Sequence, residues 1–167
     1  PVEELFNWSL EHGATMLALG RRRTPIGRGL GSTAKDLLER GEHSLLIVPP
    51  GPARDASYRR IMVPLDGSAR GDAVLPIARR IARSHGAALV LVHVVSKLEV
   101  AESARDLQLH RLHQQVEHQR KREGQTHLEA IQQSTNEAGI EVQTMVCGPG
   151  DPRSVLRDLA SSRDIDL

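Results

Sequence analysis

The stretch that decides the fold is Ile61-Met62-Val63-Pro64-Leu65-Asp66-Gly67-Ser68, a short hydrophobic run that ends in an acidic turn. A helical pattern through Ser84 follows it. A second hydrophobic run then covers Ala87 to Val95 and is apolar throughout except for His93. A strand that is apolar along its whole length is expected when helices cover both faces of its sheet. The order strand, helix, strand therefore predicts a parallel, doubly wound α/β sheet.

The same alternation extends in both directions from this stretch. Upstream, apolar spacing predicts a helix over 2–12, a strand over 14–19, a helix from Ser32 or Thr33 to Arg40, and a strand over 44–48. Downstream, it predicts a helix over most of 101–138, a strand over 140–146, a helix over 153–162, and the start of a strand at Ile165. Two local details are also expected: Asp72 as the N-cap of the helix through Ser84, and a bend or disorder where Gly124 interrupts the long helix.

The amino-acid composition limits the classes of protein to which this chain can belong. The chain has 167 residues and a formal net charge of +1, so the whole molecule does not favour nucleic acid or a membrane surface as partner. Its single cysteine, Cys147, excludes an intramolecular disulfide and fits a reducing compartment. No apolar run approaches the roughly 18 residues that a membrane span needs. We therefore expect a cytoplasmic α/β protein without a membrane partner.

The two ends of the chain share a pattern. When the sequence is compared with itself at an offset of 150 positions, three apolar pairs coincide: Leu5 with Val155, Phe6 with Leu156, and Leu17 with Leu167. Each end reads helix, short break, strand. A repeat of this length is a reasonable domain length, so the chain is expected to be one period of a tandem protein, cut out of phase.

These residues together resemble the universal stress protein family. The family's domain is a five-stranded, doubly wound sheet that opens with a strand and an Asp-Gly-Ser turn, which residues 61–68 match. Its second strand typically ends as His93-Val94-Val95 does here, and its Gly-x-Pro turn is matched by Gly150-Asp151-Pro152. Its last portion, a strand, a nucleotide-binding loop of form G-x2-G-x9-G-S/T, a helix and a strand, resembles residues 14–49.

The resemblance implies a division of the chain. Residues 1–50 would be the C-terminal part of a first stress domain, residues 51–60 a linker, and residues 61–167 the N-terminal part of a second domain. The two parts could combine as one rotated domain, or chains could complement one another. The resemblance further implies a stress-response regulatory module, and pairing of tandem domains or of copies through the edge strand Ser44 to Val48.

The resemblance also implies binding of an adenine nucleotide, ATP or AMP. Asp66 would accept hydrogen bonds from the ribose or the adenine, Pro64 and Leu65 would line the base pocket, and backbone groups of Val94 and Val95 would meet the base. The alternative is that Asp66 only forms a turn by bonding its own backbone.

A second group of candidate residues lies in the glycine-rich segment that follows Leu19. A glycine after a strand lets backbone approach a ligand, and the N–H groups at a helix N-terminus attract phosphate. By resemblance Gly20, Gly31 and Ser32 map onto the loop motif, and the Thr33 hydroxyl could add a phosphate contact. The loop departs from the motif, because Arg23 replaces its second glycine and the following spacer has seven residues rather than nine. The alternative is a glycine-rich turn with a serine helix cap.

The remaining charged and nucleophilic residues have simpler interpretations. Four arginines of the loop could hold phosphates or form a solvated basic surface: Arg21, Arg22, Arg23 and Arg28. No metal ligand set is recognised, since His110, His113 and His118 lie in a polar helix pattern. The sequence has no Walker loop and no nucleophile elbow, so at most weak ATP hydrolysis is expected. Two alternatives stay open: a stress-domain scaffold that binds no nucleotide and acts through dimerisation, and an adenylating or flavin-linked enzyme of a related class.

Overall fold

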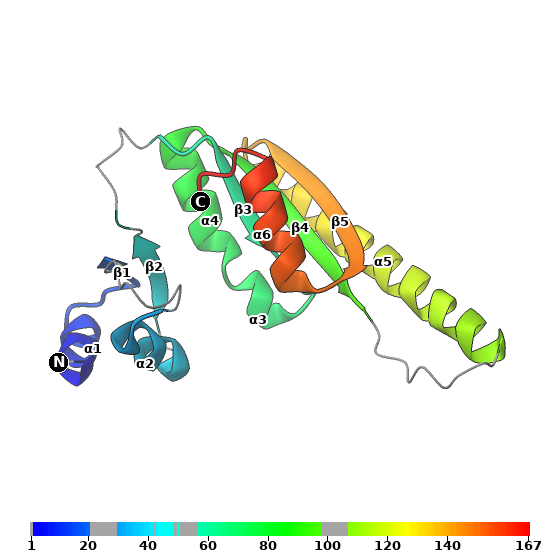
Figure 1. The fold of residues 1–167 in the computed structure, drawn as a ribbon. Helices are drawn as coiled ribbons and strands as arrows, with labels where there is room; N and C mark the ends of the chain where they lie inside the picture. The colour runs from blue at the N-terminus through cyan, green and yellow to red at the C-terminus, as the bar shows by residue number, and fades with distance from the viewer. Residues whose placement is uncertain (1, 21–29, 42, 49, 51–56, 98–106) are drawn as a thin grey trace. The chain divides into compact units, whose positions relative to one another are not determined.

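The computed structural model describes residues 2–20, 30–41, 43–48, 50, 57–97 and 107–167. Its internal contacts divide the chain into unit 1, Pro1–Asp55, and unit 2, Ala56–Leu167. Figure 1 labels the elements of both units, each of which is described by itself. Within the described residues, no helix has the length and apolar character needed to cross a bilayer.

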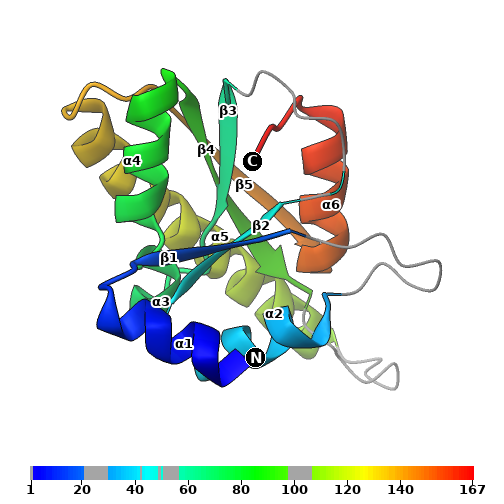
Figure 2. The same cartoon turned by 90° about the vertical axis from the view of Figure 1, so that its left-hand side faces the viewer.

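Unit 2 contains a parallel sheet whose described strands have the order β3-β4-β5. The strands are β3 (Arg60–Pro64), β4 (Ala88–Ser96) and β5 (Val142–Gly150). The helices of the unit are α3 (Ala69–Asp72), α4 (Leu75–His85), α5 (Leu107–Asn136) and α6 (Pro152–Ser162). In Figure 2, α4 and α5 lie on one side of this sheet and α6 on the other. The predicted doubly wound α/β fold, a parallel sheet with helices on both faces, is thus confirmed.

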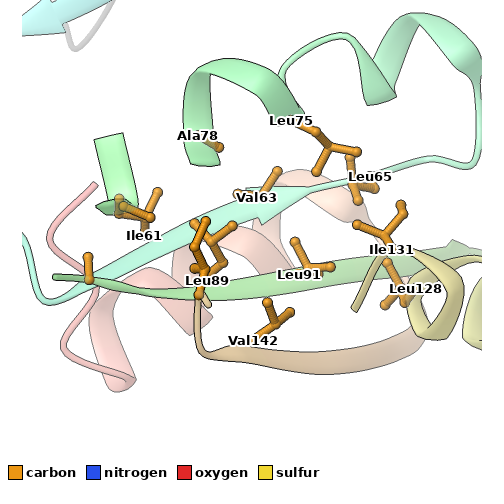
Figure 3. Packing of buried hydrophobic residues seen from close by; sticks show 13 residues of the cluster. Ile61, Val63, Leu65, Leu75, Ala78, Leu89, Leu91, Leu128, Ile131 and Val142 are labelled. Carbon is orange, nitrogen blue, oxygen red and sulfur yellow. The ribbon is translucent and has the colours of Figure 1, made fainter. Parts of the chain in front are cut away.

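Alternation along the strands builds the core of unit 2. Every second residue of β3 faces α4 and α5, and the same face of β4 carries Leu89 and Leu91, which have no exposed surface. Figure 3 shows these side chains meeting those of the two helices, including Leu75 and Leu128. The opposite face of β4 buries Val90 and Val92, on the side that α6 covers. Burial of each such aliphatic side chain contributes about 1.5–3 kcal/mol, which explains why β4 reads as apolar on both faces.

The C-terminal residues lie along the outer edge of β3. The Met62 N–H donates to the Leu167 carbonyl at 2.8 Å, and the Asp166 N–H donates to the Arg60 carbonyl at 3.0 Å. The Asp166 carboxylate in turn accepts from the N–H groups of Arg59 and Arg60, at 2.7 and 2.9 Å. The segment predicted to begin a strand at Ile165 therefore pairs with β3, although it forms no regular strand.

Unit 1 has two helices and two strands among its described residues. They are α1 (Val2–Glu11), β1 (Met16–Gly20), α2 (Ser32–Arg40) and β2 (Ser44–Val48). The strands pair in parallel, from Met16 opposite Ser44 to Gly20 opposite Val48. A small core of Phe6, Leu17 and Leu37 joins the helices to this sheet.

Three local predictions are wrong, each for a physical reason. Asp72 is not the N-cap of the helix through Ser84, because that helix, α4, begins at Leu75 with Val74 in the N-cap position. Asp72 is instead the last residue of the short helix α3, which Ser68 caps by accepting from the Gly71 N–H at 3.0 Å. The residue capping α2 is Gly31 rather than Ser32 or Thr33, and no side chain bonds there. Finally, α5 passes through Gly124 unbroken, since tertiary packing rather than helix propensity decides this position.

Candidate functional site

The turn after β3 orients the Asp66 carboxylate. Its Oδ1 accepts from the Ser68 N–H at 2.9 Å and from the Ser68 hydroxyl at 2.7 Å. Gly67 completes the turn at φ 83°, a conformation that favours glycine. The hydrogen bonds from Ser68 lower the pKa of Asp66, and His93 assists slightly. The second carboxylate oxygen, Oδ2, has no hydrogen bond to any described residue, so it is available as an acceptor.

His93 supports this turn from the neighbouring strand. Its Nδ1 lies 2.9 Å from the Leu65 carbonyl oxygen. Because a carbonyl can only accept, Nδ1 carries the proton and donates. The other side of the ring meets Gly124 of α5, where an added Cβ would lie 2.8 Å from both Cγ and Nε2 of His93. The absence of a side chain at Gly124 therefore lets α5 rest directly on the imidazole.

A second histidine, His127 of α5, contacts the end of α3. The Nε2 of His127 donates to Oδ1 of Asp72, the last residue of α3, over 3.0 Å. Both side chains are half-buried. The segment from Leu65 to Asp72, which comprises the turn and α3, is thus held by His93 at its beginning and by His127 at its end.

These contacts surround a cavity of about 390 Å³ at the carboxyl ends of β3 and β4. Its walls are the turn residues Asp66 and Gly67, residues 93–96 of β4, and four residues of α5: Arg120, Glu123, Gly124 and His127. Ligand pockets commonly occupy about 300–1,000 Å³, and in open α/β sheets they lie outside the carboxyl ends of the strands. The cavity therefore has the place and the size of a small-molecule site.

Of the site residues predicted in unit 2, some line the cavity and others lie outside it. Asp66, Val94 and Val95 line the cavity. Pro64 is the exposed last residue of β3. The side chain of Leu65 packs in the core with 3 % exposure, and its carbonyl is the group that contacts His93.

The predicted loop residues all lie in unit 1. Leu19 packs against the Phe6 cluster, and Gly20 ends β1 with an exposed backbone. Gly31, Ser32 and Thr33 form the exposed beginning of α2. An added Cβ at Gly20 or at Gly31 would meet no atom of the described residues within 4 Å. The four arginines of this loop, including Arg23, lie outside the described residues.

Several contributors to the site were not predicted as site residues, among them His93, Gly124, the charged residues Arg120 and Glu123, and the pair of His127 with Asp72. The available signals were a lone histidine in an apolar strand and a glycine inside a long helical pattern, which often has a packing reason. The described part of the chain contains no group of three side chains suited to a metal ion. Cys147 lies in β5, and burial raises the pKa of its thiol despite opposing effects of Arg163 and Lys121.

Comparison with known proteins agrees with this fold. The model of the universal stress protein family matches residues 57–167. The chain belongs to this family. A search of curated proteins finds no match.

Solved structures of universal stress proteins share the fold. UspA from Lactobacillus plantarum is 22% identical with a TM-score of 0.58, over 66% of this chain and 73% of that one. A family member from Burkholderia pseudomallei is 24% identical with a TM-score of 0.55, over 71% and 81% of the two chains. A universal stress protein from Archaeoglobus fulgidus DSM 4304 is 18% identical with a TM-score of 0.67. That match covers 99% of this chain but only 53% of the other.

Proposed function

We propose that this universal stress protein is a cytoplasmic stress-response regulatory module that binds an adenine nucleotide, ATP or AMP, at the Asp66 cavity. The observation that carries the proposal is the open Oδ2 of Asp66 on a cavity of ligand size at the carboxyl edge of the sheet. An ionised carboxylate accepts strongly from paired ribose hydroxyls. The backbone of Val94 and Val95, on the same wall, offers donors and acceptors to a base.

The chain offers a matched control for testing Asp66. Asp151, the N-cap of α6, makes the same two kinds of hydrogen bond with a serine three residues on rather than two, because its Oδ2 accepts from the Ser154 N–H at 2.9 Å and from the Ser154 hydroxyl at 2.8 Å. Asp151 is exposed and is not among the residues that line the cavity. In isothermal titration of the whole chain with ATP, AMP and adenosine, Asp66→Ala should abolish binding whereas Asp151→Ala should preserve it. Equal binding by both variants, or no binding by the unmodified protein at millimolar nucleotide, would refute the proposal.

We further propose that unit 1 is the C-terminal part of one stress domain and unit 2 the N-terminal part of the next. Two observations support this division: the family model begins at residue 57, and the chain matches about half of the Archaeoglobus fulgidus protein over its own full length.

The second candidate function is a nucleotide-free scaffold that associates through β2. Among the described residues, β2 pairs with β1 alone, and Val48 is 45% exposed. A parallel strand with an open edge is suited to pairing with another strand. Leu46→Lys should then lower the sedimentation-derived mass of the protein, and an unchanged mass would count against this function.

A further inference from the structure

The α5 wall of the cavity has features that the Asp66 turn does not explain. Arg120, Gly124 and His127 lie at spacings of four and three residues, so they share one face of the helix. Because Gly124 is buried against the His93 ring, the helix backbone comes close to the sheet at this point. The side chains one turn before and one turn after the glycine therefore flank the cavity.

The charges on this wall differ in whether they already have partners. His127 is engaged by Asp72 at 3.0 Å. Glu123 accepts from Gln119 of its own helix at 2.9 Å. Arg120 is exposed and makes no hydrogen bond or ion pair with any described residue. Arg120 and Asp66 line the same cavity, so the guanidinium and the second carboxylate oxygen of Asp66 are both available to a ligand there.

We propose that the Asp66 cavity takes a nucleoside monophosphate, with the ribose hydroxyls on Asp66 and the single phosphate on Arg120. The inference rests on the proposed function and adds a phosphate partner within unit 2, separate from the glycine loop of unit 1. A guanidinium fork matches the oxygens of one phosphate. The neighbouring Glu123 carboxylate repels additional negative charge, so the cavity favours one phosphate over three.

The test compares AMP, ATP and adenosine in titrations of the whole chain. Arg120→Gln removes the cation, and Arg122→Gln is the matched control, since Arg122 is an exposed arginine of the same helix that does not line this cavity. We expect Arg120→Gln to weaken AMP binding about 10-fold and to leave adenosine binding unchanged, because only AMP carries the phosphate. Arg122→Gln should leave both affinities unchanged.

A second variant should change the affinity for AMP in the opposite direction. Glu123→Gln keeps an acceptor for Gln119 but removes the negative charge, so it should tighten AMP binding and narrow the preference for AMP over ATP. Thermal unfolding of each variant checks that the fold is retained.

The outcomes separate this inference from the proposed function. If Asp66→Ala abolishes adenosine and AMP binding while Arg120→Gln and Arg122→Gln bind AMP equally, the phosphate assignment is overturned and the nucleotide function stands. If Arg120→Gln weakens adenosine as much as AMP, or if ATP binds more tightly than AMP, the assignment is also overturned. If the unmodified protein binds none of the three compounds, both proposals fail.

Discussion

Substituting Gly124 by alanine tests the contact that seats α5 on the sheet. Two effects oppose one another in Gly124→Ala. Alanine in a helix interior is favoured over glycine by about 1 kcal/mol. Against this, the new Cβ would lie 2.8 Å from Cγ and Nε2 of His93, and overpacking of this kind costs about 1–3 kcal/mol.

His93 cannot easily move to make room. Its Nδ1 donates to the Leu65 carbonyl at 2.9 Å, and loss of such a hydrogen bond costs about 1 kcal/mol. The sum of the three effects is a net destabilisation of unit 2 by about 1–3 kcal/mol. In a His93→Ala background the obstacle is gone, so the same substitution should stabilise the protein by about 1 kcal/mol.

The assay is native-state hydrogen exchange of the β4 amides, because these report the unfolding free energy of unit 2 separately from unit 1. The cycle comprises the unmodified protein, the two single variants and the double variant. We expect Gly124→Ala to lower the unfolding free energy of the unmodified protein and to raise that of the His93→Ala variant. If Gly124→Ala stabilises both backgrounds equally, the imidazole is not what requires glycine at this position.

Three further predictions concern the site turn, the sheet edge and the core. Ser68→Ala should raise the pKa of Asp66 toward its ordinary value, since hydrogen bonds from Ser68 are the main cause of its lowering; NMR titration of the carboxyl carbon measures this. Hydrogen bonds from the N–H groups of Arg59 and Arg60 lower the pKa of Asp166. Its contribution to the stability of unit 2 is therefore present above the ordinary pKa of about 3.9 and is lost as pH falls through the lower folded value. Asp166→Asn should therefore destabilise unit 2 in urea unfolding at pH 7. At a pH low enough to protonate Asp166 in both the folded and the unfolded state, the variant should match the stability of the unmodified protein. Leu128→Ala, at a side chain with no exposure, should cost about 2–5 kcal/mol in the same assay, and a loss below 1 kcal/mol would contradict the packing described.

The parts of the fold that the sequence predicts well are those with local causes. The strand over 61–65 is recognisable because apolar residues run into Asp66, Gly67 and Ser68, whose turn chemistry needs no distant partner. Its boundary shifts by one residue, to Arg60–Pro64. The long apolar run of β4 is recognisable for the same reason, since burial on both faces leaves an unambiguous pattern.

The α5 side of the site depends on contacts between residues far apart in the chain. Gly124 is 31 positions from His93, and in the sequence alone a glycine in a polar helical stretch indicates a break. Its actual role appears only when α5 crosses the end of β4. Similarly, the sequence indicates Asp72 as a helix cap, but α4 begins only at Leu75, and the Asp72 carboxylate pairs with His127, which is 55 positions away.

The pairing of residues 166 and 167 with β3 has a consequence for how this protein meets other chains. Bare N–H and C=O groups on an outer strand act as a template on which foreign strands can align, and this is a common origin of aggregation. Here a few residues saturate part of that template at Arg60 and Met62. The Asp166 carboxylate helps to hold these residues on the start of β3, so strong acid, which neutralises Asp166, would weaken the pairing and favour exposure of this strand edge.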